Sequence, residues 1–150
     1  MADPVSAVLF AEDRAHEAFL RPLLRRLAGD AGRALSIQIY SARGGHPRAM
    51  EELRVFQTVL EKKVAGLEEP DLVVVAIDAN CTPWHRARRR IAQALALRLR
   101  GKAAIACPDP HVERWFMADP VSFEKALGRR PKPGRRKCER ARYKIGRAHV

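Results

Sequence analysis

The stretch LVVVAIDAN, residues 72–80, decides the fold. It is a continuous apolar run rich in β-branched valine, it follows the polar segment 68–71, and it ends in Asp78 and Asn80. Such a run predicts a strand that is buried on both faces. In an open parallel α/β sheet, ligands bind beyond the carboxyl ends of the strands. We therefore expect Asp78 and Asn80 to present oxygen ligands at the tip of a core strand.

The rest of the chain alternates strand and helix patterns around this stretch. Strands are expected at residues 5–10, 36–40, 72–77 and 103–107, the second of them nearer an edge. Apolar residues at helical spacing predict helices over 15–29, 50–64 and 84–99, with Pro22 expected to kink or restart the first. Short helices are expected at 112–117 and after Asp119-Pro120. This order predicts an α/β fold: a Rossmann-like, doubly wound, mostly parallel four-stranded sheet.

The charge of the chain is unevenly distributed. The 150 residues carry 29 Lys and Arg against 17 Asp and Glu, a formal net charge of +12, and 47% of them are hydrophobic. Residues 129–150 hold ten of the basic residues and one acidic residue, which is nine of the twelve net charges. A surplus of this kind predicts a polyanionic partner, nucleic acid above all.

The composition predicts one folded domain followed by a basic segment. We expect an α/β domain over residues 1–128 and a basic, truncated C-terminal arm over 129–144. The last six residues, IGRAHV, match the translation of a common sequencing-library adaptor, so residues 145–150 are expected to be an artefact. They carry no functional inference.

The absence of membrane and secretion signals and the spacing of the cysteines limit the class of protein further. No apolar run reaches the ~20 residues that a membrane helix needs, and the first residues lack the basic region of a signal peptide. We therefore expect no membrane association and a cytoplasmic protein. Cys81, Cys107 and Cys138 have no CxxC spacing, which disfavours a disulfide framework or a zinc site.

Polar side chains follow two strands that neighbour each other in most doubly wound sheets. Glu12 follows the first strand, and Asp78 and Asn80 follow the third. Few carboxylates at one sheet edge suit Mg²⁺ (or Mn²⁺), which keeps several waters and shares its sphere with a phosphate. Such a metal would neutralise phosphate charge and activate a water. Alternatively, Glu12 and Asp78 only cap the helices that follow them.

Two of these segments resemble the TOPRIM fold, the metal-binding α/β module of topoisomerases, primases and OLD-type nucleases. They are VLFAEDRAHEAFLRPLLRRLA (residues 8–28) and VVVAIDAN (73–80). The later segments PHVERWFMADP (110–120) and KCERARYK (137–144) resemble an uncharacterised bacterial branch of TOPRIM-like proteins. The resemblance covers roughly residues 5 to 144.

The resemblance implies roles for particular residues. Glu12 would be the general acid/base glutamate and a metal ligand, Asp78 the first metal aspartate, and Asn80 the second ligand. Two positions depart from the family pattern: Asp13 stands where glycine is usual, and Asn80 replaces an aspartate. A site of reduced activity, or an inactive one, is therefore an open alternative.

Further acidic residues could reach the same edge of the sheet and contact the metal ligands without binding the metal themselves: Glu17, Glu113 and Asp119. The alternative for Glu113 is a surface or capping role. His16 is expected at a solvated helix position, and His85 and His111, which have no partner spacing, are not expected to be ligands. Trp115 and Phe116 are expected in the core rather than as a platform for stacking bases.

Arginines open the helix after Asp78, where the helix dipole disfavours cations. Arg86, Arg89 and Arg90 are the candidates for phosphate binding there, against the alternative of a solvated arginine-rich face. The loop ARGGHP (42–47) could also approach phosphate through its backbone.

The sequence thus predicts a metal-dependent, nuclease-type TOPRIM-like protein that acts on phosphodiester bonds, linked to mobile DNA or defence. The alternative is a non-catalytic nucleic-acid-binding or accessory module that keeps the sheet and the basic arm. A third hypothesis is a phosphatase-like or receiver-like domain that binds Mg²⁺ without cutting nucleic acid. The oligomeric state stays open.

Overall fold

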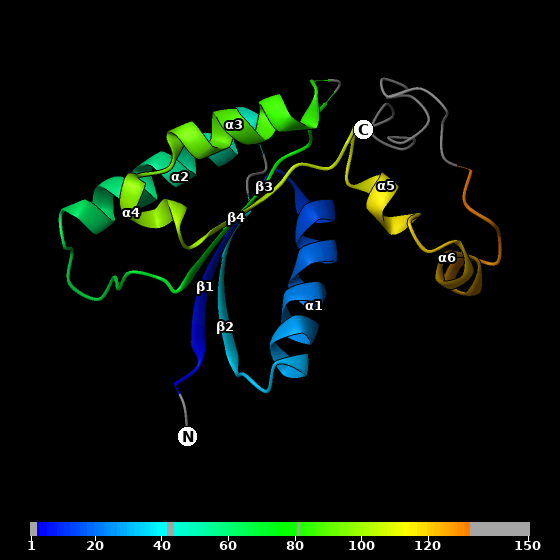
Figure 1. Cartoon of the computed structure of the whole chain (residues 1–150), viewed down its shortest axis with the longest axis horizontal. Helices are drawn as coiled ribbons and strands as arrows, with labels where there is room; N and C mark the ends of the chain where they lie inside the picture. Colours follow the sequence, from blue (N-terminus) through cyan, green and yellow to red (C-terminus); the bar gives the residue numbers. More distant parts are fainter. Residues whose placement is uncertain (1–2, 42–43, 81, 133–150) are drawn as a thin grey trace.

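The structure, a computed structural model, describes residues 3–41, 44–80 and 82–132. Four strands form one sheet in the order β2-β1-β3-β4, and each neighbouring pair is parallel (Figure 1). The strands are β1 (Val5–Ala11), β2 (Leu35–Ser41), β3 (Leu72–Ala76) and β4 (Ala103–Ala106). The predicted α/β fold, consistent with a Rossmann-like doubly wound sheet, is confirmed, and the second strand lies at an edge as expected.

Helices cover both faces of this sheet. The helices in the described residues are α1 (Arg14–Asp30), α2 (His46–Glu61), α3 (Trp84–Ala94), α4 (Leu97–Arg100), α5 (Glu113–Phe116) and α6 (Pro120–Leu127). Helices α2, α3 and α4 lie on one face, and α1 lies on the other (Figure 1). Two apolar clusters result, one containing Leu53 and Ile91 from the first face and one containing Leu20 from α1.

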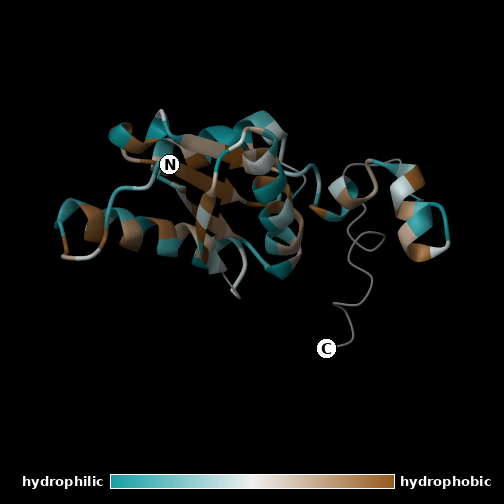
Figure 2. Cartoon of the chain, turned by 90° about the horizontal axis from the view of Figure 1, so that it is seen from below, coloured by the Kyte–Doolittle hydropathy of each residue, from teal (hydrophilic) through white to brown (hydrophobic). Residues whose placement is uncertain are grey.

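The two central strands are buried on both faces. Leu9, Phe10, Val73 and Val75 are all fully buried, which explains why β1 and β3 are nearly continuous apolar runs. Burying a side chain of this size contributes about 1.5–3 kcal/mol. Figure 2 shows the hydrophobic colour concentrated on these strands in the interior. The register sets Ala11 of β1 opposite Ala76 of β3, so both strands end at the same edge of the sheet.

The single helix predicted over residues 84–99 is wrong: the chain forms α3 and α4 with a break between them. Leu95 and Ala96 adopt extended backbone angles there. The buried Gln57 of α2 replaces the missing helical hydrogen bonds, because its amide donates to Ala94 O at 3.1 Å and accepts from Ala96 N at 2.6 Å. The break therefore turns the chain toward β4 without leaving these backbone groups unpaired.

Helix ends elsewhere follow local rules. Pro22 lies inside α1, and the helix continues through it, so the alternative of a restart is wrong. Asp119 caps α6 by accepting from the N–H groups of Val121 and Ser122, and Gly128 ends α6 in the left-handed conformation. Among the described helices, none combines the length and the apolar character that crossing a bilayer requires.

Candidate metal centre

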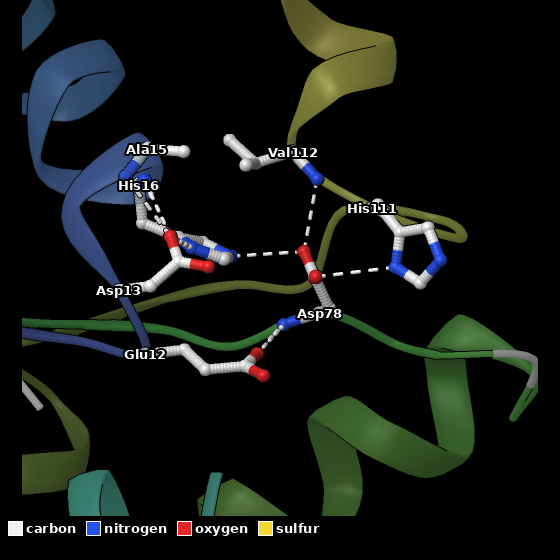
Figure 3. Close-up of polar contacts among 7 residues, drawn as sticks. All are labelled: Glu12, Asp13, Ala15, His16, Asp78, His111 and Val112. Carbon is white, nitrogen blue, oxygen red and sulfur yellow. Dashed lines mark hydrogen bonds and ion pairs between the residues drawn. The ribbon is translucent and has the colours of Figure 1, made fainter. Parts of the chain in front are cut away.

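Glu12 and Asp78 meet at the carboxyl edge of the sheet, as the strand order predicts. The N–H of Glu12 continues the β1–β3 ladder by donating to Ala76 O at 2.9 Å. The N–H of Asp78 in turn donates to Glu12 Oε2 at 2.8 Å (Figure 3). The half-buried Glu12 side chain is therefore tied to the tip of the neighbouring strand and does not cap the helix that follows it.

His16 completes this group, and the expectation that it is solvated is wrong. It lies in the first turn of α1 and is fully buried. Its Nδ1 lies 2.7 Å from Asp13 Oδ1, and its Nε2 lies 2.9 Å from Asp78 Oδ1 (Figure 3). The reason is the phase of α1: Asp13 is the N-cap, and three residues later the helix turns His16 toward the strand tips.

The two carboxylates hold a proton on this imidazole. Burial by itself lowers the pKa of His16, but the hydrogen bond to Asp13, the contact with Asp78 and the charges of both carboxylates outweigh it. Together they raise the pKa of His16 to about 9. In the absence of a metal, the imidazolium therefore balances the charge of Asp78, whose side chain is almost fully buried.

Asp78 is fixed from the opposite side by the segment after β4. That segment returns across the tip of β3, where Ala79 N donates to Pro108 O at 2.8 Å. Val112 N then donates to Asp78 Oδ1 at 2.9 Å, and His111 Nδ1 lies 3.2 Å from Asp78 Oδ2. His111 is fully buried, and its contact with Asp78 is one that its sequence spacing does not reveal.

One ligand atom from each of Glu12, His16 and Asp78 lies within 4.8 Å of the others. The three residues are hereafter called the Glu12–His16–Asp78 cup. Nε2 of His16 makes no hydrogen bond of good geometry, although it lies 2.9 Å from Asp78 Oδ1. Two carboxylates and one imidazole are an ordinary donor set for a divalent metal. The residues present fit such an ion.

Asn80, the predicted second ligand, lies on a turn just past the cup. Its backbone is left-handed, with φ 55°, a conformation that asparagine tolerates better than most residues. Its N–H donates to Pro110 O at 3.0 Å, and its side chain is exposed whereas Asp78 is buried. Its role as a ligand stays a prediction.

The three acidic residues expected behind the metal ligands are differently placed. Glu17 is half-buried in the first turn of α1, beside His16 in the sequence. Glu113 opens α5, and its Oε2 is buried without a hydrogen bond. Asp119 is exposed and has a capping role, because it accepts hydrogen bonds from the N–H of Ser122 in α6 and from Ser122 Oγ.

The aromatic and arginine predictions concern the surroundings of the cup. Trp115 packs against Phe19 of α1 with ring centroids 5.5 Å apart, and Phe116 packs against the same ring at 5.1 Å. Trp115 is partly buried against the α1 cluster, whereas Phe116 is exposed, so the expected core position of Phe116 is wrong. The phosphate-binding candidates are all exposed on α3: Arg86, Arg89 and Arg90.

Several predictions lie outside the described residues. They concern Cys81, Arg43 of the ARGGHP loop and all of residues 133–150, which include most of the basic arm. Within that loop, Gly45 is described and is the residue before α2, with φ 77°, a value that favours glycine.

No protein-family model, curated protein or solved structure matches this chain.

Proposed function

We propose that this protein is a metal-dependent, nuclease-type enzyme that hydrolyses phosphodiester bonds of nucleic acid. The observation that carries the proposal is the convergence of Glu12, His16 and Asp78 at the carboxyl edge of the sheet. Ligands of open α/β sheets bind at this edge. A divalent ion held there would neutralise phosphate charge and lower the pKa of an attacking water.

The chain supplies a rigid frame around that position. Asp78 is oriented by Val112 N–H and by His111, and Asp13 orients His16. Glu12 is tied through Oε2 to Asp78 N–H, which leaves Oε1 as its second oxygen for a ligand or a proton. Glu12 is accordingly the residue that we assign as general acid/base.

Basic and aromatic side chains of α3 and of the segment after β4 support a nucleic-acid substrate. A cavity of about 440 Å³ lies beside the segment that carries His111 and includes Trp84, Arg114 and Trp115 in its lining. The exposed indole of Trp84 suits bases, and the guanidinium group of Arg114 suits phosphates. The exposed arginines of α3 support the same substrate class.

The resemblance of residues 8–28 and 73–80 to the TOPRIM module supports the same proposal, and with it a link to mobile DNA or defence. Asp13, which departs from the glycine of that pattern, is not a defect here. It caps α1 through Ala15 N–H and His16 N–H and at the same time contacts His16 Nδ1.

A second candidate is a non-catalytic nucleic-acid-binding module. The observation that favours it is the exposed Asn80, a neutral side chain where the resembled pattern has a metal-binding aspartate. In this case, the arginines of α3 and the basic residues after position 128 would bind the phosphate backbone without any need for the cup.

Cleavage assays with isosteric variants separate the two. The purified chain is incubated with supercoiled plasmid or single-stranded RNA in Mg²⁺, in Mn²⁺ or in EDTA. We expect cleavage with metal that is lost in EDTA, in Glu12→Gln and in Asp78→Asn. Glu61→Gln, an exposed residue at the end of α2, is the matched control and should cleave like the parent. Salt-sensitive binding that survives Asp78→Asn, with no cleavage in any metal, would establish the second candidate instead.

A further inference from the structure

The cup contains a nitrogen donor that is aimed into it. His16 Nε2 is buried, lies 2.9 Å from Asp78 Oδ1, and makes no hydrogen bond of good geometry. Two ligands in neighbouring positions of an octahedral shell, each about 2.1 Å from the metal, lie about 3 Å apart. The spacing of Nε2 and Oδ1 is therefore also that of two ligands to one ion, which would displace the Nε2 proton that the metal-free imidazolium carries.

The imidazole is also held in the orientation that a metal ligand needs. Asp13 Oδ1 lies 2.7 Å from Nδ1, and Asp13 is itself fixed by Ala15 N–H at 3.0 Å and His16 N–H at 3.2 Å. A carboxylate on one ring nitrogen fixes the tautomer and makes the other nitrogen a better donor. Asp13 and His16 thus have the arrangement carboxylate, histidine, metal, with the metal position beside Asp78.

Charge favours a dication in the same place. Three carboxylates, from Glu12, Asp13 and Asp78, surround one imidazole in a part of the fold that is closed from solvent on the side of His111. Poorly screened negative charge of this kind attracts a cation more strongly than an exposed acidic cluster does.

The donor set discriminates between dications. Mg²⁺ is a hard ion that keeps oxygen ligands and waters, whereas imidazole suits Mn²⁺, Fe²⁺, Ni²⁺ and Zn²⁺ better than it suits Mg²⁺. We propose that the Glu12–His16–Asp78 cup selects a divalent transition-metal ion over Mg²⁺, with His16 Nε2 as the selecting ligand and Asp13 as its positioning residue. This inference rests on the proposed function for the site and replaces the Mg²⁺ expectation for the ion.

Direct binding measurements test the inference without any cleavage assay. The metal-free full chain is titrated calorimetrically with ZnCl₂, MnCl₂ and MgCl₂. We expect one site for Zn²⁺ and Mn²⁺, with Mn²⁺ at least about tenfold tighter than Mg²⁺ and Zn²⁺ tighter still. Equal affinity for Mg²⁺ and Mn²⁺, or tighter Mg²⁺, would overturn the inference.

Variants assign the selectivity to the two residues. His16→Asp makes an all-oxygen cup and should narrow or invert the Mn²⁺ to Mg²⁺ preference. His46→Asp, the same change at an exposed histidine that begins α2, should leave all affinities unchanged. If His16→Asp does not fold, Asp13→Asn gives the answer, because it keeps the cap and should weaken Mn²⁺ and Zn²⁺ binding about 10–100-fold with a smaller effect on Mg²⁺. Unchanged Mn²⁺ binding in the folded variants would refute the role of His16.

The outcomes separate this inference from the proposed function. Selective transition-metal binding without cleavage of plasmid or RNA would sink the nuclease proposal and leave the ion selectivity intact. Cleavage that depends on Glu12 and Asp78 and is fastest in Mg²⁺, together with tighter binding of Mg²⁺ than of Mn²⁺, would support the nuclease proposal and refute the ion selectivity.

Discussion

His16 Nε2 lies 2.9 Å from Asp78 Oδ1, so the first turn of α1 and the tip of β3 share one buried charge pair. The pair links two parts of the chain that are distant in sequence. It also makes the stability of the metal-free protein depend on a single imidazole, because a buried carboxylate without a compensating charge is costly.

The first prediction concerns pH. His16 has a pKa of about 9 in the folded chain and 6.5 as its ordinary value, so the folded state binds its proton more tightly. The stabilisation is complete below pH 6.5 and is lost as the pH rises through 9. Between pH 6.5 and 8.5, in EDTA, the free energy of unfolding should fall by about 2 kcal/mol. Urea denaturation at these two values measures it.

His16→Gln is the control for this pH dependence and should show a nearly flat stability over the same range. The upper pH of 8.5 keeps the contribution of Cys107 to the pH dependence of stability small, because burial raises the pKa of its thiol to about 11. A parent protein whose stability does not change over the range would contradict the charged pair.

The second prediction separates the two roles of Asp13. Asp13→Asn keeps an N-cap side chain for α1 and removes the charge beside His16, whereas Asp13→Ala removes both. The Ala variant should be less stable than the Asn variant by about 1 kcal/mol. Both should lower the pKa of His16, which proton NMR of the imidazole measures. An unchanged His16 pKa in Asp13→Asn would contradict the contact.

The third prediction concerns the break between α3 and α4. Gln57→Ala leaves Ala94 O and Ala96 N without their partner in a partly buried position. The cost should be about 2 kcal/mol or more, since each unsatisfied buried group costs about 1–3 kcal/mol. Gln93→Ala, at an exposed position of α3, should change stability by less than about 0.5 kcal/mol. Thermal unfolding of both variants measures the difference, and equal effects would show that the bridge contributes nothing.

The fourth prediction concerns α3 as a phosphate-binding helix. Replacing Arg86, Arg89 and Arg90 together by Ala should weaken DNA binding and reduce the slope of log affinity against log salt by about 0.9 for each phosphate that is no longer neutralised. The matched control replaces three exposed arginines of α1: Arg21, Arg25 and Arg26. Fluorescence anisotropy with a labelled duplex at several salt concentrations measures the slopes. Equal effects of the two triple replacements would mean that only net charge matters.

The strands and the edge where Glu12 and Asp78 meet were predictable from sequence. Valine-rich runs such as residues 72–76 favour a strand in a sheet that is covered on both faces, and a parallel arrangement brings the carboxyl ends of the strands together. The Asp119-Pro120 start of α6 was predictable for an equally local reason, because it needs only a cap and a first-turn proline.

The histidines were not predictable, because their positions depend on how elements dock. The rotation of α1 about its axis decides whether His16 faces solvent or β3. The spacing of the apolar residues alone does not determine this rotation. A local signal did exist: Asp13 and His16 have the spacing of an N-cap and the third helical residue, and the N-cap carboxylate there accepts from the backbone N–H of His16 and also contacts its ring. His111 comes from an irregular segment that has no periodicity to read.

The central claim is that Glu12, His16 and Asp78 hold one divalent ion. Calorimetric titration of the metal-free chain with MnCl₂, beside Asp78→Asn and Glu61→Gln, tests it most directly. We predict one Mn²⁺ per chain in the parent and in Glu61→Gln, and loss of that site in a folded Asp78→Asn. Mn²⁺ binding that is unchanged in Asp78→Asn, or no binding by the parent at millimolar Mn²⁺, would contradict it.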